Sequence, residues 1–399
     1  MTMPLPLPLA GLTVLDFTRV YSGPYATLML SDLGATVIKV EHPNGGDDSR
    51  SFGPFIGGSS GYFETLNRGK QSICIDYKQA EGQCLLRELA RTVDIVIENF
   101  RPGQMARLGL DYATLRVLNP ELVYVSISGF GQQSSVISGN SVDVSRGCYD
   151  IVAQAESGLM SLTGLPHQPL KTGPALGDAI TGLTAAVGLL AALWAKERHG
   201  RGAYLDIAMV DAVFACLENA LSEYDVTHRV PQRQGNADIA LAPFDGFEAN
   251  DGWIVIGVGN DTLWRRLAKL IDPHLADDAR FATNALRVAH YDALRPILVE
   301  WCAVQSADAV LTCLHQAGIP AGRVRDMQAL ACDPRLESRR MLAALNLADG
   351  NRVVVPGCPI QIEGVSPTTY RRAPQLGEHT QAVLGSRLGY IVSQGSTGL

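Results

Sequence analysis

The chain has 399 residues, which is enough for one or two domains with a sizeable hydrophobic core. Charged residues make up 18% and hydrophobic residues 46% of the chain, a globular balance that excludes a disordered protein. The net charge of −7 and the lack of a long basic run argue against nucleic acid as a partner.

The N-terminal region and the cysteines indicate a cytoplasmic protein. The first nine residues carry no basic segment and are broken by prolines, so we expect no signal peptide. Eight cysteines are scattered without a Cys-x-x-Cys pair, which suits free thiols in a reducing compartment and argues against a zinc site. The histidines are dispersed as well, so we expect no metal and no permanently bound cofactor.

The first third of the chain alternates between short apolar runs and helical patterns. A helix is predicted over 24–33, and strands are predicted at 12–17, 36–41, 72–76, 93–98 and 122–126. Such alternation predicts a doubly wound, Rossmann-like α/β sheet with parallel strands. Ligands of these sheets lie beyond the carboxyl ends of the strands, so the candidate site loops are 18–24, 41–52, 99–107 and 127–150.

A long helix is predicted around the uncharged stretch from Ala179 to Ala195. Gly173-Pro-Ala-Leu-Gly-Asp178 precedes it, and Lys196-Glu-Arg-His-Gly200 closes it with cations and a glycine. The stretch is shorter than the roughly 20 residues of a membrane span, so we expect a buried helix in a soluble core and no membrane partner. Asp178 is either an N-cap or a reactive carboxylate, and the helix pattern alone favours the cap.

In the second half of the chain, the residue pattern predicts a strand at 203–209 and a helix over 210–227. A stretch rich in glycine and proline follows. A smaller α+β domain is predicted from a strand at 253–259 and helices at 261–271, 289–304 and 306–317. The tail predicts strands near 352–355 and 359–363 and a last helix at 377–387.

The chain lacks the sequence motifs of two common enzyme classes. Glu41 at the end of the second predicted strand invites comparison with nucleotide-dependent oxidoreductases, in which such an acid binds a ribose. The first turn reads Thr18-Arg-Val-Tyr-Ser-Gly-Pro24, with one glycine instead of the Gly-x-Gly-x-x-Gly that a pyrophosphate needs. A Gly-x-Ser-x-Gly nucleophile elbow is also missing, so serine hydrolase chemistry is not supported.

The candidate site loops carry cationic and aromatic side chains that would suit a phosphate-rich ligand with an adenine, such as coenzyme A. The cations that could neutralise phosphates are Arg19, His42, Arg50, Arg68, Lys70, Arg101 and Arg107. The aromatic residues that could flank a flat group are Tyr21, Phe52, Phe100 and Tyr149.

Several weak motifs follow one another along the chain. They are Gly11-Leu-Thr-Val-Leu-Asp-Phe-Thr18, Leu33-Gly-Ala-Thr-Val-Ile-Lys-Val-Glu41, Gly46-Asp47 with Arg50, Glu98-Asn-Phe-Arg-Pro-Gly103, Leu176-Gly-Asp178 and Ala373-Pro-Gln-Leu-Gly-Glu-His-Thr380. By their order and spacing the chain resembles the class III CoA-transferases, the family of formyl-CoA:oxalate and carnitine CoA-transferases, over nearly its whole length. The segments 46–54, Gly235-Asn236 and Ala242-Pro-Phe244 are most similar to the acetyl-CoA:oxalate branch.

The resemblance implies that Asp178 is the nucleophile, which reverses the preference for an N-cap. Asp178 would take the acyl group of a thioester as a mixed anhydride, become an aspartyl-CoA thioester and pass CoA to a small (di)carboxylic acid, with oxalate as the expected acceptor. Coenzyme A is then a substrate, and the positions implied to contact it are Val20, Tyr21, Asn99, Phe100, Arg107 and Tyr149. The positions implied near the small acid are Phe52, Tyr62 and Gly235.

The resemblance also implies an interlocked homodimer whose active sites use both chains. The large CoA-binding domain would hold residues 1–203 and 328–399, and the small domain residues 228–314. Two features depart from the family: Tyr21 stands where oxalate-using relatives often have Gln, and Gly235-Asn236 replaces the tetraglycine loop of formyl-CoA transferase.

An acyl-CoA racemase of the same superfamily is the alternative reaction class. Those relatives carry the histidine of a Gly-His-Asp motif where this chain reads Gly147-Cys148-Tyr149-Asp150. A cysteine is a poor substitute for the histidine base that removes the proton next to the thioester, so the transferase is favoured.

Overall fold

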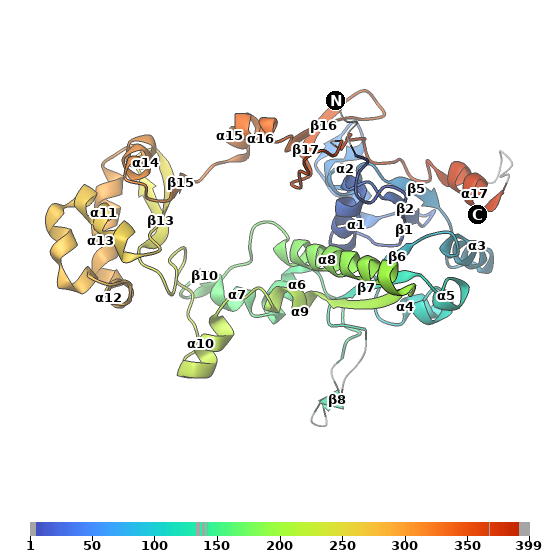
Figure 1. The fold of residues 1–399 in the computed structure, drawn as a ribbon, viewed down its shortest axis with the longest axis horizontal. Coiled ribbons are helices and arrows are strands. Elements are labelled where there is room, and N and C mark those ends of the chain that lie inside the picture. The colour runs from blue at the N-terminus through green and yellow to red at the C-terminus, as the bar shows by residue number, and fades with distance from the viewer. Residues whose placement is uncertain (1–4, 133–135, 138–139, 142, 367, 391–399) are drawn as a thin grey trace. The chain divides into compact units, whose positions relative to one another are not determined.

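A computed structural model of the chain describes residues 5–132, 136–137, 140–141, 143–366 and 368–390. The chain divides into two compact units (Figure 1). Unit 1 takes Met1–Leu159, Thr172–Leu221 and Pro334–Leu399, and unit 2 takes Met160–Lys171 and Ser222–Asp333.

A six-stranded parallel sheet forms the centre of unit 1, in the order β12-β7-β6-β1-β2-β5. Its strands are β1 (Thr13–Asp16), β2 (Thr36–Glu41), β5 (Gln71–Cys74), β6 (Ile95–Glu98), β7 (Val123–Ser128) and β12 (Ala203–Ala208). The winding direction changes between β1 and β6, so a crevice is expected beyond the carboxyl ends of these two strands. The predicted parallel α/β sheet is confirmed, with each predicted strand within two residues of its position.

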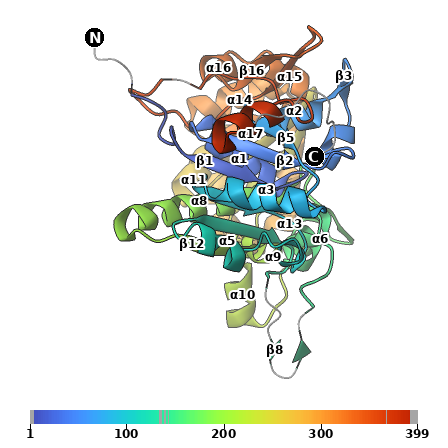
Figure 2. The ribbon, with the colours of Figure 1, turned by 90° about the vertical axis from the view of Figure 1, so that its right-hand side faces the viewer.

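Helices cover both faces of this sheet because successive side chains of each strand point to opposite faces. Val14 and Leu15 of β1 are both buried, but they belong to different hydrophobic cores. The core of Val14 includes α1 (Ser22–Asp32) and α8 (Leu176–His199). The core of Leu15 includes α3 (Ala80–Ala90), α5 (Tyr112–Leu118) and α17 (Thr380–Leu388), and Figure 2 views unit 1 from their side.

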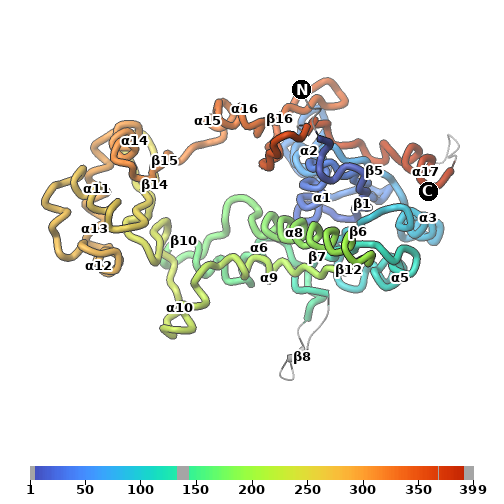
Figure 3. The backbone as a smooth tube through the Cα atoms, viewed as in Figure 1, coloured from blue at the N-terminus to red at the C-terminus, as the bar shows by residue number. Residues whose placement is uncertain are grey.

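The C-terminal segment returns to the edge of the sheet at β5 (Figure 3). The N–H of His379 donates to the carbonyl of Ser72 at 2.9 Å, and the N–H of Cys74 donates to the hydroxyl of Thr380 at 2.9 Å. The N–H of Gly377 donates to the hydroxyl of Ser72 at 2.9 Å. The tail motif therefore fixes the start of α17 beside β5.

Unit 2 is built on an antiparallel sheet of β13 (Phe244–Ala249), β14 (Gly252–Gly257) and β15 (Ala321–Arg323). Phe247 and Ile254 of this sheet pack with Trp264 and Leu298 in one buried core. The surrounding helices include α11 (Asp261–Ile271), α13 (Tyr291–Ala303) and α14 (Ala307–Gln316), which confirm the three helices predicted for this region.

Two local predictions are wrong, and some strands were missed. No strand forms at 359–363, and β17 (Arg352–Pro356) pairs instead with β16 (Leu342–Asn346), which the pattern missed. The helix predicted over 210–227 is split into α9 (Met209–Phe214) and α10 (Ala220–Thr227), between which Glu218 adopts a φ of 52°. The strand β13 was missed because of Gly246, where a Cβ would meet Asn236 Nδ2 at 2.9 Å.

The long helix α8 is buried on one face only, which corrects the expectation of a buried helix. Thr181, Ala185 and Leu189 are buried against the rest of unit 1, whereas Val187 and Trp194 are exposed. By length and composition alone α8 would suit a membrane span. Its buried face nevertheless packs against α1 and the sheet, as the face of a core helix does in a globular domain.

Candidate active site

A cavity of about 260 Å³ opens at the carboxyl ends of β1, β6 and β7. It lies where the sheet changes its winding direction, the place at which ligands of doubly wound sheets bind. Each of the four candidate site loops contributes to its walls, and Asp178 from the start of α8 joins them. The strand order thus gathers residues that are far apart in the sequence.

Six of the residues implied by the family resemblance line this cavity: Val20, Tyr21, Asn99, Phe100, Tyr149 and Asp178. Phe52 and Tyr62 lie beside it, because the Tyr62 ring centroid is 6.2 Å from that of Tyr21 and 5.5 Å from that of Phe52. Arg107, at the end of α4 (Gln104–Arg107), is exposed and is not among the described lining residues. Gly235 belongs to unit 2, so its role at this cavity stays a prediction.

Asp178 lies in the first turn of α8 and faces the first turn of α1. Gly182 explains how the two helices come so close, since a Cβ at this position would meet the carbonyl oxygen of Ser22 at 2.6 Å. The backbone N–H and the hydroxyl of Ser22 lie close enough to the Asp178 carboxylate to lower its pKa. The carboxylate therefore lies at the positive end of the α1 dipole, a place that stabilises an anion.

The helix pattern alone favours an N-cap role for Asp178, but another residue has this role in the structure. The helix begins after Ala175, and Asp178 lies inside its first turn. Asp150 Oδ1 accepts the N–H of Gly177 at 2.8 Å and that of Asp178 at 3.3 Å. Gln154 Nε2 donates to the other oxygen of Asp150 at 2.7 Å. Asp150, which we did not predict as a site residue, satisfies the start of α8 and leaves the Asp178 carboxylate available for chemistry.

The environment of Asp178 favours its protonated form more than water does. Burial raises the pKa of Asp178 to about 7, and the negative charge of Asp150 acts in the same direction. The N–H and the hydroxyl of Ser22 oppose this rise. A carboxylate of this kind is more basic than an ordinary aspartate, and a perturbed pKa in a cavity is a frequent sign of a functional residue.

Two phenols stand near this carboxylate. Burial raises the pKa of Tyr62, and the negative charge of Asp178 adds to the effect. Burial also raises the pKa of Tyr21, with smaller contributions from Tyr25 and Asp178. Both phenols therefore keep their protons at neutral pH and can donate hydrogen bonds to a bound anion.

Three arginines give the cavity a cationic wall: Arg19, Arg101 and Arg146. Arg146 binds Glu156 through two hydrogen bonds of 2.8 and 2.9 Å, and its guanidinium lies 4.2 Å from the centroid of the Phe130 ring. Arg19 pairs with Asp48 at 2.8 Å. Arg19 and Arg146 are thereby held in place at the cavity, where planar guanidinium groups suit phosphates and carboxylates.

Three other cations that we predicted as phosphate ligands serve the fold instead. They form the ion pairs Arg50–Glu41, Arg68–Asp32 and Lys70–Asp16 at 2.6, 2.5 and 3.2 Å. Both oxygens of Glu41 are occupied, by Arg50, by the hydroxyl of Ser72 and by the N–H of Asp47. Glu41 therefore does not offer the free carboxylate that would bind a nucleotide ribose.

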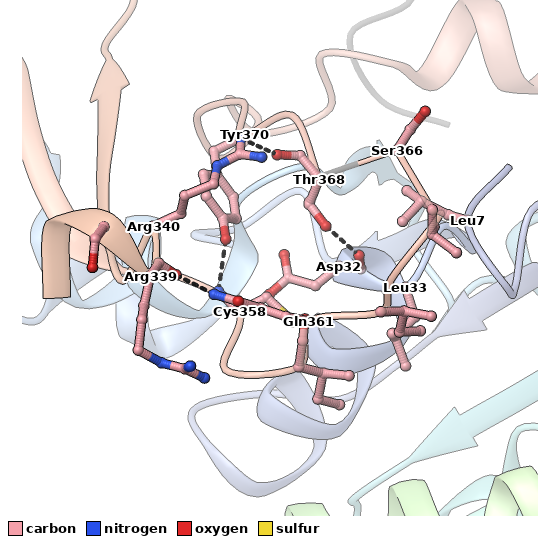
Figure 4. A pocket seen from close by; sticks show the side chains of 14 residues that line it. Leu7, Asp32, Leu33, Arg339, Arg340, Cys358, Gln361, Ser366, Thr368 and Tyr370 are labelled. Atoms are coloured by element: carbon pink, nitrogen blue, oxygen red, sulfur yellow. Dashed lines mark hydrogen bonds between the residues drawn. The ribbon is translucent and has the colours of Figure 1, made fainter. Parts of the chain in front are cut away.

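A second cavity, of about 320 Å³, lies at the other end of α1 (Figure 4). The eleven residues of α1 place it about 16 Å from Ser22. Its polar groups bind one another: the Thr368 hydroxyl donates to the Asp32 carbonyl, and the Cys358 N–H donates to the Tyr370 hydroxyl. We assign the chemistry to the first cavity, where the Asp178 carboxylate lies at the start of α1.

Comparison with known proteins places these residues in a family. The family model described as CoA-transferase family III matches residues 9–380. The succinate–glutarate CoA-transferase of Agrobacterium fabrum is 41% identical, over 94% of this chain and 95% of its own. The acetyl-CoA:oxalate CoA-transferase of Acetobacter aceti is 40% identical with the same coverage. The crystal structure of a CAIB/BAIF family protein from Brucella suis matches with a TM-score of 0.82 at 36% identity, over 96% of this chain and all of the other.

Proposed function

The chain belongs to CoA-transferase family III, and from this premise we propose that it moves CoA from an acyl-CoA thioester to a small dicarboxylic acid through Asp178. The observation that carries the proposal is the Asp178 carboxylate, which lines the strand-end cavity together with Ser22 at the start of α1. Relatives are named for succinate, glutarate and oxalate, and we propose oxalate as the first acceptor to test.

The proposed reaction keeps the acyl group activated at each step. Asp178 attacks the donor thioester carbonyl, the C–S bond breaks, and a mixed anhydride and CoA thiolate form. The thiolate attacks Cγ of Asp178, which releases the donor acid and leaves an aspartyl-CoA thioester. The acceptor carboxylate then displaces the thiolate from Cγ and forms a second anhydride. The thiolate finally attacks the acceptor acyl carbon, giving the new acyl-CoA and the free Asp178 carboxylate.

The start of α1 supplies stabilisation for two of these steps. When the thiolate or the acceptor attacks Cγ, negative charge develops on an oxygen of Asp178. The Ser22 N–H and hydroxyl lie close enough to this carboxylate to lower its pKa, and the first N–H groups of a helix have no acceptor within it. Fixed donors of this kind stabilise an oxyanion without reorganisation during the reaction.

The remaining assignments follow the same proposal. We propose that CoA is bound by Val20, Tyr21, Asn99, Phe100, Arg107 and Tyr149, in a large domain made of residues 1–203 and 328–399. The small acid would be bound by Phe52, Tyr62 and Gly235, the last from a small domain of residues 228–314. Free cysteines throughout the described residues support a cytoplasmic location.

Cys148, which stands in place of the racemase histidine, is not a suitable base. Burial raises the pKa of Cys148 to about 11, and the negative charge of Asp178 adds to the effect. A thiol of this kind stays protonated at neutral pH and does not remove a proton next to a thioester.

The proposal is tested by combining transfer assays with chemical trapping. Succinyl-CoA and acetyl-CoA are offered with oxalate, glutarate or succinate, and formation of the new thioester is followed by chromatography. In parallel, the enzyme is incubated with donor thioester and hydroxylamine, and its peptides are mapped by mass spectrometry. We expect a hydroxamate on the peptide that carries Asp178. A label on another residue, or no transfer to any of these acids, would contradict the proposal.

Replacing Asp150 by asparagine should move the pH dependence of the reaction. Asp178 attacks as the carboxylate, so kcat/KM should rise with pH through the pKa of about 7. The substitution keeps an oxygen for the N–H of Gly177 but removes a negative charge, so the pKa of Asp178 falls and the acid limb moves to lower pH. Asp225→Asn, at an exposed position, is the control. An acid limb that does not move in Asp150→Asn would refute the effect of the Asp150 charge on the pKa of Asp178.

We further propose that the protein is a homodimer and that α8 contributes to its interface. Leu183, Val187, Leu190 and Trp194 recur on one face of α8 and are exposed in the single chain. Light scattering should give twice the chain mass of 42.8 kDa, and Val187→Glu with Trp194→Glu should give monomers without activity. The equally exposed Val117→Glu should stay dimeric; monomeric wild-type protein would exclude the proposal.

A further inference from the structure

The turn between β1 and α1 has a backbone conformation that its sequence does not favour. Val20 has a φ of 69°, in the left-handed region that β-branched residues rarely adopt. Two residues later, Ser22 starts α1, and its N–H and hydroxyl lower the pKa of Asp178. The strained residue therefore lies next to the groups that hold the proposed nucleophile, a place where strain often has a function.

Side chains from other elements bind the backbone of this turn at three successive residues. The carbonyl of Thr18 accepts a hydrogen bond of 2.7 Å from Lys39 Nζ. Arg19 exchanges two hydrogen bonds, of 2.8 and 2.9 Å, with the side-chain amide of Asn99. The N–H of Val20 donates to Asp47 Oδ1 at 3.1 Å. The turn is thus held from β2, from the loop after β6 and from the Gly46-Asp47 motif.

Asp47 and Lys39 form an ion pair of 2.8 Å, and both side chains are fully buried. Asp47 Oδ1 also accepts hydrogen bonds from the N–H and the hydroxyl of Ser49, at 2.9 and 2.8 Å. Although burial opposes it, Lys39 and Ser49 hold the pKa of Asp47 well below its usual range. Asp47 is therefore a permanent anion with one oxygen directed at the turn.

We propose that Asp47 is a positioning residue for CoA transfer: paired with Lys39, it holds Val20 in the left-handed conformation and thereby keeps Ser22 directed at Asp178. The inference rests on the proposed function, because Ser22 matters for the reaction only if Asp178 is the nucleophile. Asp47 is not among the described residues that line the cavity, so it acts through the turn and not on the substrate.

An asparagine at position 47 cannot replace the carboxylate. Its amide has one accepting oxygen and one donating NH₂ group. If the oxygen faces the N–H groups of Val20 and Ser49, the NH₂ group faces the ammonium of Lys39. If the amide is turned over, the NH₂ group faces those N–H groups instead. Either orientation brings donors together, so Asp47→Asn should release the turn.

We expect Asp47→Asn to lower kcat about tenfold at a nearly unchanged KM for acyl-CoA, because the loss concerns orientation and not binding. The acid limb of the pH profile should move to higher pH, since the N–H and hydroxyl of Ser22 lower the pKa of Asp178 and a loose turn weakens their effect. Glycine adopts a positive φ without steric cost, so Val20→Gly added to Asp47→Asn should restore kcat by about threefold. Val20→Ala added to Asp47→Asn is the matched control and should restore nothing.

The inference would be overturned if Asp47→Asn kept the kcat and pH profile of the wild type. It would also be overturned if the double variants with Val20→Gly and Val20→Ala were equally active. Hydroxylamine trapping on the wild-type enzyme separates the two proposals. A missing label on Asp178 would remove the proposed function, whereas a normal label with an unaffected Asp47→Asn would remove only the role of Asp47. If Asp47→Asn does not fold, the double variant Lys39→Met with Asp47→Ala removes both members of the ion pair and leaves neither charge unpaired. In that background, adding Val20→Gly must give a higher kcat than adding Val20→Ala.

Discussion

Asp178→Asn should abolish CoA transfer and leave the fold intact. The amide cannot form an anhydride or an aspartyl-CoA thioester, and loss of a covalent nucleophile commonly costs about 10⁴-fold or more in kcat. Stability should change little, because Asp150 and not Asp178 accepts the N–H groups at the start of α8. The measurements are kcat for each acyl-CoA and acid pair, the melting temperature, and the affinity for CoA by calorimetry.

Asp150→Ala is the matched control for this result. It removes the acceptor of the Gly177 N–H, so it should lower the stability by about 1 kcal/mol, as loss of a capping side chain does. Asp178→Asn should not reproduce that loss of stability. A variant Asp178→Asn that melts like Asp150→Ala and still transfers CoA would assign Asp178 a structural role and refute the proposed chemistry.

The parallel sheet could be predicted because its signal is local. Residues such as Val14 and Leu15 are both apolar because each faces a different helix layer, so the strand appears as a continuous apolar run. The order of strands and helices then fixes which loops reach the carboxyl ends of the strands. The cavity is formed by the predicted loops for this reason.

The groups that act on Asp178 could not be predicted in the same way. Ser22 reaches Asp178 because α1 and α8 approach each other at Gly182, a contact between residues 160 positions apart. Asp150 reaches the start of α8 from another helix. The proline at position 24 marks a helix start, and this was the one local sign that Ser22 would present free N–H groups.

The partners of the charged residues near the strand ends could not be predicted from the sequence either. A cation after a strand can point to solvent, where it binds phosphate, or into the fold, where it neutralises a buried acid. The sequence does not distinguish these directions, and Arg68 and Lys70 point inward. Beneath the cavity, Asp16, Lys39, Asp47 and Lys70 form a buried group of alternating charges. This group fixes the turn after β1, so the stability of unit 1 and the geometry of the site depend on the same side chains.

Lys70→Met should therefore have the largest effect on stability. Lys70 Nζ binds Asp16 at 3.2 Å, the Thr27 hydroxyl at 2.7 Å and the Asn67 side chain at 2.9 Å, and Lys70 and Asp16 are fully buried. Methionine keeps most of the volume but leaves the charge of Asp16 without its closest cation, and removal of one partner of a buried pair costs about 3–5 kcal/mol. The exposed Lys78→Met should change the free energy of unfolding by less than about 0.5 kcal/mol.

The pH dependence of this loss tests its electrostatic origin. Although burial opposes it, Lys70 and Lys39 hold the pKa of Asp16 below its usual range in the folded protein. The resulting stability is present above the ordinary pKa of an aspartate and is lost as the pH falls through the folded value. Without Lys70 the folded pKa of Asp16 rises, so the difference in urea unfolding free energy between wild type and Lys70→Met should be largest at neutral pH and smaller at about pH 4. A difference that does not change with pH would mean that Lys70 stabilises the fold by packing its side chain and not by its charge.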